Sequence, residues 1–157
     1  MPLTRTLSTA LIVFLIDRAS KIWVVEVMSL DTRFEIPLWP PFLKLMMAWN
    51  TGINFGLLSA PEGLGRLILV GLALAIVVLL LIWVRKLPER RSHFMVGAIV
   101  GGALGNVWDR VQYGAVADFL NVSCCRIDNP YAFNLADVAI FLGAAGLVLY
   151  SGKPKIK

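Results

Sequence analysis

The sequence is poor in charge and has very little histidine or cysteine. Only 16% of its 157 residues are charged, and it holds one histidine and two cysteines. A soluble domain of this length usually carries about 25% charged residues. The two cysteines, Cys124 and Cys125, are adjacent, a spacing that suits neither a zinc site nor a disulfide framework. We therefore predict no metal and no other cofactor.

Several catalytic motifs are also missing. The sequence has no His-Glu-x-x-His zinc motif and no Gly-x-Ser-x-Gly nucleophile turn. The glycines from Gly101 to Gly105 lie in an apolar run without the Lys-Ser/Thr ending of a phosphate loop. The net charge of +5 sits in clumps between apolar runs, so it does not indicate a nucleic-acid partner.

What the chain has in excess is apolar residues, at 58% of the sequence and a mean hydropathy of +0.75. A membrane span needs about 20 mostly apolar residues, and in lipid it must be helical to satisfy its backbone. We therefore predict an all-α membrane protein with a single domain over 1–157. Four transmembrane helices are expected at about 7–28, 67–84, 94–113 and 133–150.

The first span is expected to be retained instead of cleaved as a signal peptide. The charged pair Asp17-Arg18 follows its apolar run at once, where a small-residue cleavage site would be needed. Lysine and arginine are denser on the side that holds both termini and the 85–93 loop, so that side is predicted to be cytoplasmic. Segments 29–66 and 109–132 then face outward. Within 29–66, residues 42–49 predict a short strand-like or interfacial element.

Two aspartates stand out as candidate catalytic residues. Asp137 lies three residues after Asn134, a natural N-cap, and its plainest role would be to complete a capping box. Asp118 falls at the same outer level, where a solvated loop acid is the more common finding. Together, two carboxylates in an apolar site have separated pKa values. Such a pair can activate water and polarise an amide carbonyl.

Other polar residues have structural interpretations. Asp17 and Lys21 share one face of the first helix, where a buried ion pair is the economical explanation. Gly97, Gly101 and Gly105 form a small-residue face that predicts close packing of the third helix. From the residues alone, a proton-coupled transporter or a structural membrane protein stays open, since polar groups within spans serve both.

Four motifs carry a resemblance that covers essentially the whole chain. They are Asp17-Arg-Ala-Ser-Lys21, Trp49-Asn-Thr-Gly-Ile-Asn-Phe-Gly56, the block from Gly102-Ala-Leu-Gly-Asn-Val-Trp-Asp-Arg110 to Val116-Ala-Asp-Phe-Leu120, and Phe133-Asn-Leu-Ala-Asp137. With these motifs the chain resembles lipoprotein signal peptidase, also called signal peptidase II. Ile53-Asn54 departs from the family's usual two alanines.

The resemblance implies an aspartic-type membrane endopeptidase of the bacterial cytoplasmic membrane. Such an enzyme removes signal peptides from diacylglyceryl-modified prolipoproteins, cleaving before the lipidated cysteine at the outer leaflet. It implies Asp118 and Asp137 as the catalytic pair and a structural role for Asp17 and Lys21. The residues implied to position the substrate or support the dyad are Asn50, Gly52, Asn106, Arg110 and Asn134. The expected partners are the prolipoprotein and membrane lipids, and the chain is expected to be a monomer.

Overall fold

Helices make up most of the computed structural model, which describes residues 2–52, 63–124 and 129–151. Its four long helices agree with the four predicted segments to within a few residues at most ends. They are α1 (Pro2–Lys21), α3 (Leu64–Trp83), α4 (Arg90–Tyr113) and α5 (Leu135–Ser151). The first helix continues as a π-helical turn, η1 (Ile22–Val27), before the short α2 (Leu30–Arg33), and α3 ends in a 3-10 turn, η2 (Val84–Lys86).

The helices differ in how well they suit a membrane. Within the described residues, one helical stretch, Leu64–Lys86, is both long and apolar enough to cross a bilayer, and the apolar helix Leu135–Tyr150 is shorter. The helix α1 carries several charges, which the hydropathy of a simple span does not accommodate. The four-span arrangement therefore stays a prediction.

A three-stranded antiparallel sheet corrects the all-α prediction. Its strands are β1 (Glu35–Trp39), β2 (Leu43–Asn50) and β3 (Val116–Val122), in the order β1-β2-β3. The strand β2 confirms the strand-like element predicted at 42–49. The third strand comes from the segment between the last two helices, so the β element is not confined to the connection between the first two spans. An unpaired β2 edge would leave backbone groups without partners, and β3 satisfies them.

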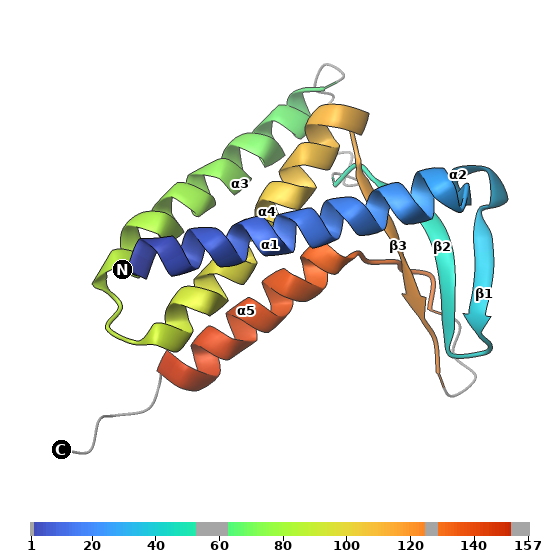
Figure 1. Ribbon diagram of the computed structural model, residues 1–157. Helices are drawn as coiled ribbons and strands as arrows, with labels where there is room; N and C mark the ends of the chain where they lie inside the picture. The colour runs from blue at the N-terminus through green and yellow to red at the C-terminus, as the bar shows by residue number, and fades with distance from the viewer. Residues whose placement is uncertain (1, 53–62, 125–128, 152–157) are drawn as a thin grey trace.

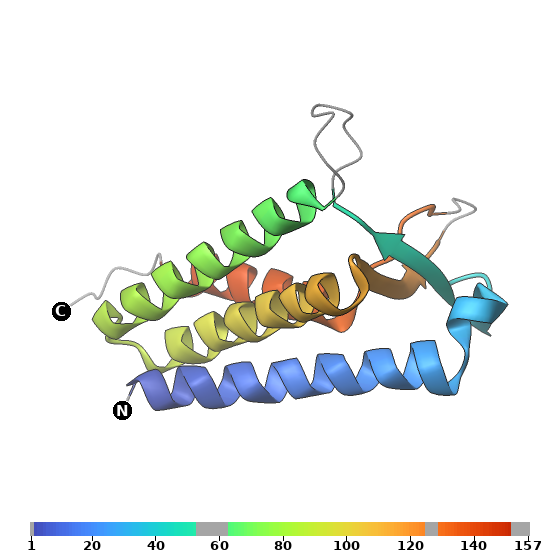
Figure 2. The same cartoon turned by 90° about the horizontal axis from the view of Figure 1, so that it is seen from above.

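The sheet lies at one end of the helix bundle, as Figures 1 and 2 show. The start of α1, the end of α5 and the α3–α4 connection lie at the other end. The central helix is α4, which packs against α1, α3 and α5. Because β3 follows α4 directly, the fold brings the strand to the same end of the bundle as the start of α5.

Glycines allow the neighbours of α4 to approach closely. A Cβ atom at Gly97 would lie 2.7 Å from the carbonyl oxygen of Thr6, and one at Gly101 would meet the backbone of Ala10. The predicted packing face is therefore confirmed, with α1 as its partner. Gly102 lets α5 approach α4 closely in the same way, because a Cβ atom there would lie 2.5 Å from the carbonyl oxygen of Ala136.

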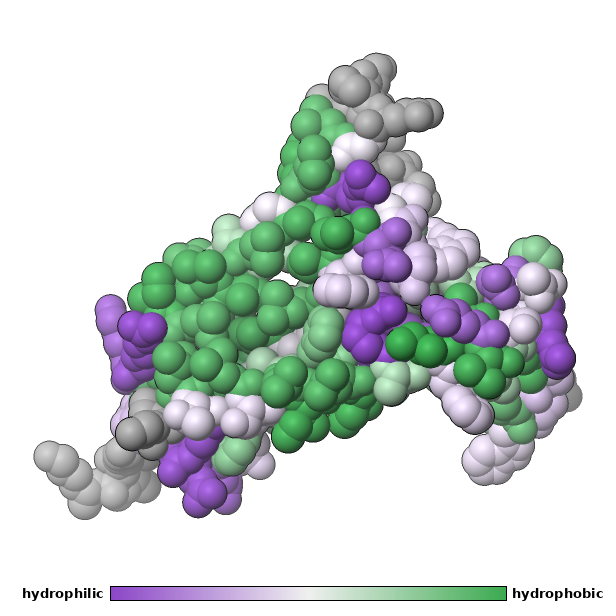
Figure 3. All heavy atoms as spheres, turned by 45° about the horizontal axis from the view of Figure 1, so that its top comes forward, coloured by the Kyte–Doolittle hydropathy of each residue, from purple (hydrophilic) through white to green (hydrophobic). Residues whose placement is uncertain are grey.

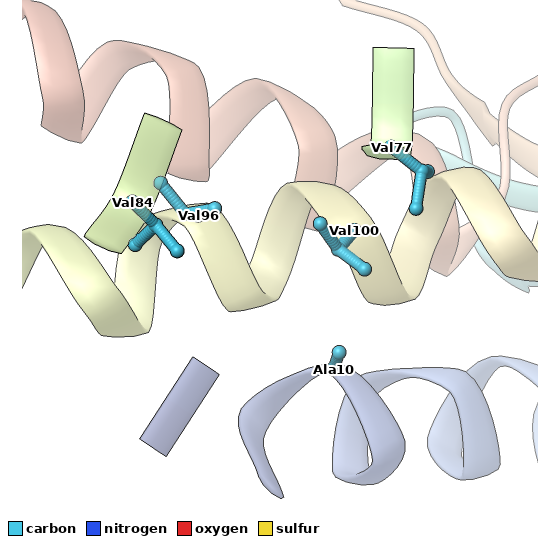
Figure 4. Packing of buried hydrophobic residues seen from close by; sticks show 5 residues of the cluster. All are labelled: Ala10, Val77, Val84, Val96 and Val100. Carbon is cyan, nitrogen blue, oxygen red and sulfur yellow. The ribbon is translucent and has the colours of Figure 1, made fainter. Parts of the chain in front are cut away.

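Apolar side chains fill the bundle and also cover it. One buried cluster joins α1, α3 and α4 and is drawn in Figure 4. A second lies between η1, α2 and the sheet and includes Leu30 and Phe119. The outer faces of the helices are apolar as well, with Leu79 of α3 and Val148 of α5 65% and 77% exposed. In Figure 3 the apolar surface lies over the helices, and hydrophilic residues gather at its two ends.

We expect glycine-to-alanine changes on different helices to have opposite effects on stability. Gly97→Ala should lower the free energy of unfolding by about 1–3 kcal/mol, because the new methyl group overpacks the α1–α4 contact. Gly71→Ala should raise it by up to about 1 kcal/mol, because alanine favours the helix and a Cβ there would meet no described atom within 4 Å. Thermal unfolding in detergent would measure both, and a rise in Tm for Gly97→Ala would contradict the packing described.

Candidate active site

Asp118 lies in the middle of β3, where pairing with β2 fixes its backbone opposite Ala48. Its side chain is only 3% exposed. Two amides hold the carboxylate. The Nδ2 atom of Asn134 donates to Oδ1 at 2.6 Å, and Nδ2 of Asn50 donates to Oδ2 at 3.1 Å. Taken by itself, Asp118 was predicted to be a solvated loop acid. It is instead buried, and both of its carboxylate oxygens accept hydrogen bonds.

Asp137 lies in the first turn of α5 and forms the predicted capping box with Asn134. The backbone N–H of Asp137 donates to Oδ1 of Asn134 at 2.9 Å, and the backbone N–H of Asn134 donates to Oδ2 of Asp137 at 3.3 Å. The other carboxylate oxygen accepts a hydrogen bond of 2.8 Å from Nδ2 of Asn106. Asp137 therefore caps α5 and also lies close enough to Asp118 for the two charges to interact.

Asn134 connects the two acids. It is fully buried, donates from its side chain to Asp118 and donates from its backbone to Asp137. Its Nδ2 atom also donates to Oδ1 of Asn106 at 3.2 Å. Residues from β2, β3, α4 and the start of α5 therefore meet in one hydrogen-bonded cluster.

Burial raises the pKa of Asp118 from 3.8 to about 6. Loss of solvent is the largest cause, and the nearby negative charge of Asp137 raises the pKa further. The hydrogen bonds from Asn50 and Asn134 act in the opposite direction, because they stabilise the ionised form. Asp118 therefore keeps its proton at pH values well above those usual for aspartate.

Arg110 and Gly52 lie beside the pair. The Arg110 guanidinium donates to the carbonyl oxygen of Asn106 at 3.4 Å and interacts electrostatically with both carboxylates. Gly52 has a φ of +78°, and a Cβ there would lie 2.6 Å from Leu69 Cδ1 and 3.4 Å from Arg110 Nη2. Glycine is favoured by both its backbone conformation and the lack of space.

Some predicted features fall elsewhere. Ile53, Asn54 and Cys125 lie outside the described residues, as does part of the 29–66 segment. Cys124 is exposed and lies just after β3.

The predicted ion pair is present, and two further charges that the sequence did not assign to the site join it. Lys21 Nζ lies 2.9 Å from Asp17 Oδ2 and 2.6 Å from Asp109 Oδ2, and Arg18 pairs with the other oxygen of Asp109. The available signal was charge balance. Asp17, Arg18 and Lys21 lie within about one helical turn and carry two cations but one acid. Glu26 lies more than one turn beyond Lys21, so an acid from another helix is the partner to look for.

This arrangement is suited to acid–base chemistry on water. It holds two carboxylates of different environment through one shared amide, at the end of an apolar bundle. Burial of Asp118 lets one carboxyl keep a proton while the other acts as a base. A water molecule activated by such a pair can attack an amide carbonyl.

Comparisons of the sequence with known proteins agree on one family. A family model described as signal peptidase (SPase) II matches residues 9–152. A lipoprotein signal peptidase from Methylorubrum extorquens (strain PA1) is 41% identical over 88% of this chain and 80% of the relative. Another from Rhodopseudomonas palustris (strain TIE-1) is 34% identical over 99% and 98%. A bacterial membrane enzyme solved by the in meso method shares the fold, with a TM-score of 0.80 and 24% identity over 96% of this chain and 94% of that one.

Two substitutions should move the pKa of Asp118 in opposite directions. Asp137→Asn should lower it, because a nearby negative charge is lost, and Asn50→Ala should raise it, because a hydrogen bond to the ionised form is lost. The carboxyl stretching band of ¹³C-labelled aspartate, followed by infrared spectroscopy against pH, would measure both shifts. Asp118→Asn identifies the band, and Asp31→Asn, which changes an exposed acid of α2, should leave it unchanged. Shifts of the same sign would contradict the described environment.

Proposed function

The chain belongs to the signal peptidase II family, and from this premise we propose that Asp118 and Asp137 are its catalytic pair. The chain is a peptidase that removes signal peptides from prolipoproteins. The aspartic mechanism is our proposal. The observation that carries it is the pair of carboxylates joined through Asn134, with the pKa of Asp118 raised to about 6.

The proposed reaction starts with one carboxyl ionised and the other protonated. The carboxylate takes a proton from water as its oxygen attacks the carbonyl carbon of the scissile bond, and the protonated carboxyl donates to the carbonyl oxygen. As the C–N bond breaks, the carboxyl that took the proton from water passes it to the leaving nitrogen. The other carboxylate regains its proton from the former carbonyl oxygen as the C=O bond re-forms.

The polar residues around the pair are proposed to orient the substrate. Asn50 is exposed while it contacts Asp118, so it can meet a peptide that enters beside the strand. The absence of a side chain at Gly52 keeps access to Arg110 open. The Arg110 guanidinium would then stabilise negative charge that develops on the carbonyl oxygen. Asn106 and Asn134 support the acids directly.

The protein is a bacterial inner-membrane protein, and the finer arrangement is proposed. We infer four spans, formed by α1, α3, α4 and α5, with both termini cytoplasmic and the sheet outside. The apolar surface over the helices supports this arrangement. The exposed Trp39 and Trp49 suit the headgroup region. The site would then meet a diacylglyceryl-modified substrate at the outer leaflet, cut before the lipidated cysteine by a monomeric enzyme.

Both acids should be essential. Asp118→Asn and Asp137→Asn keep the side-chain size but remove the ionisable group, so each should lower kcat by at least about 10³-fold. Cleavage of a diacylglyceryl-modified prolipoprotein by purified enzyme would measure this. Asp31→Asn provides the control, because it removes an exposed acid of the same type. Each variant must show the wild-type unfolding transition.

Near-normal cleavage by either folded variant would remove that residue from the catalytic pair. Activity retained in both would instead favour another mechanism within the same family. An inactive Asp31→Asn variant would show that loss of any acid disturbs the enzyme, and the test would then count against a specific dyad.

The topology can be checked by cysteine labelling in intact cells, with Cys124 and Cys125 replaced by serine. A cysteine at position 33, in α2, should react with a reagent that does not cross the inner membrane. A cysteine at position 86, in η2, should react only after the membrane is opened. The reverse pattern would contradict the proposed orientation.

A further inference from the structure

A closed group of four charges lies beside the proposed catalytic pair. It comprises Asp17, Arg18 and Lys21 of α1 and Asp109 of α4, here called the charge cluster. Lys21 is 1% exposed, and the two acids are fully buried. The formal charges cancel, which is the condition under which buried charges are tolerated. The proposed catalytic step uses none of these four residues.

Each acid of the charge cluster holds the backbone next to a catalytic aspartate. The N–H of Ala117, which precedes Asp118, donates to Oδ2 of Asp109 at 3.2 Å. The N–H of Ala136, which precedes Asp137, donates to Oδ1 of Asp17 at 3.0 Å. These two hydrogen bonds, here called the anchors, are accepted by acids on different helices and hold different elements, β3 and α5. In both cases the donor is the backbone N–H of the residue just before a proposed catalytic aspartate.

Lys21 joins the two anchors. Its ammonium group lies 2.9 Å from the carboxylate of Asp17 and 2.6 Å from that of Asp109. The same group donates to Oδ1 of Asn106 at 3.3 Å. This contact turns the amide oxygen of Asn106 toward the lysine, so that its Nδ2 atom faces Asp137.

Gly105 of α4 leaves room for the carboxylate of Asp17. A Cβ at Gly105 would lie 2.5 Å from Oδ2 of Asp17. The absence of a side chain there lets the carboxylate reach between α4 and α5. The third glycine of the packing face therefore admits a charged side chain, where the first two admit the backbone of α1.

We propose that Lys21 is a positioning residue that fixes the separation of Asp118 and Asp137 through Asp109, Asp17 and Asn106. This inference rests on the proposed function, since it concerns the geometry of the same catalytic pair. It replaces the purely structural role expected for Lys21. A stabilising ion pair would affect folding alone, whereas a positioning group also affects the rate of the chemical step.

Lys21→Met tests the proposal, because it keeps the length of the side chain and removes the ammonium. A displacement of catalytic groups by about 1 Å can cost about 10²-fold in rate, so kcat should fall by about 10²-fold while KM changes less than about threefold. Cleavage is measured below the unfolding transition of each variant. Gly97→Ala serves as the stability-matched control, since it disturbs the α1–α4 contact away from the charge cluster and should keep kcat within about threefold.

A second variant covers the case in which Lys21→Met does not fold. Lys21→Met alone leaves one buried acid without a cation. In Asp17→Asn/Lys21→Met the remaining charges, Arg18 and Asp109, cancel again, so no buried charge is left uncompensated. The amide at position 17 can still accept from Ala136, so kcat should fall less, by about tenfold. Unchanged kcat in the double variant, or an equal loss of kcat in Gly97→Ala, would overturn the positioning role.

Amide hydrogen exchange followed by NMR tests the anchors without any substrate. In Lys21→Met the amides of Ala117 and Ala136 should exchange at least about tenfold faster, and in the double variant Ala117 should be affected more than Ala136. Lys44→Met breaks an exposed ion pair with Glu35 and should change neither amide. Unchanged exchange in Lys21→Met would overturn the proposal. Faster exchange in an enzyme whose wild type does not cleave would instead count against the proposed function.

Discussion

Lys21 lies where α1 and α4 meet the sheet end of the bundle, with two carboxylates within 3 Å of its ammonium group. An apolar bundle can hold these charges only if they are paired, so the contact fixes how α1 lies against α4. Asp109 and Asp17 pass this constraint to Ala117 and Ala136. The strand and the helix that carry the proposed catalytic acids are thus held by the same neutral group of charges.

Close helix contacts make this arrangement possible. Without side chains at Gly97 and Gly101, α1 lies against the backbone of α4, and Gly102 gives α5 the same access on another side. A side chain at any of these positions would move a neighbouring helix outward. At Gly102 such a shift would move Ala136 away from Asp17, whereas Gly97 lies about two helical turns before Gly105 and away from the charge cluster. Close helix packing therefore helps to set the distances between the polar groups at the end of the bundle.

Periodicity and capping patterns predicted much of this fold. Apolar runs located four helices, and the spacing of Asn134 and Asp137 predicted a capping box that is present. The third strand was missed, because the 109–132 segment was predicted only to face outward, and only pairing with β2 identifies residues 116–122 as a strand. Asp109 was missed for a similar reason, since its partners are in α1. Contacts between distant segments leave no local pattern in a sequence.

The charges of α1 also bear on the order in which the chain can enter a membrane. Arg18 and its partner Asp109 are 91 positions apart, and at about 5–20 residues per second the acid is synthesised on the order of ten seconds after the arginine. During that interval Arg18 and Lys21 lack their acidic partner from α4, and unpaired charges are costly to hold in lipid. In the proposed topology, α1 therefore gains its final depth only when α4 arrives. Insertion of the first span is completed by the third, and no shortened chain ending before Asp109 should hold α1 in its native place.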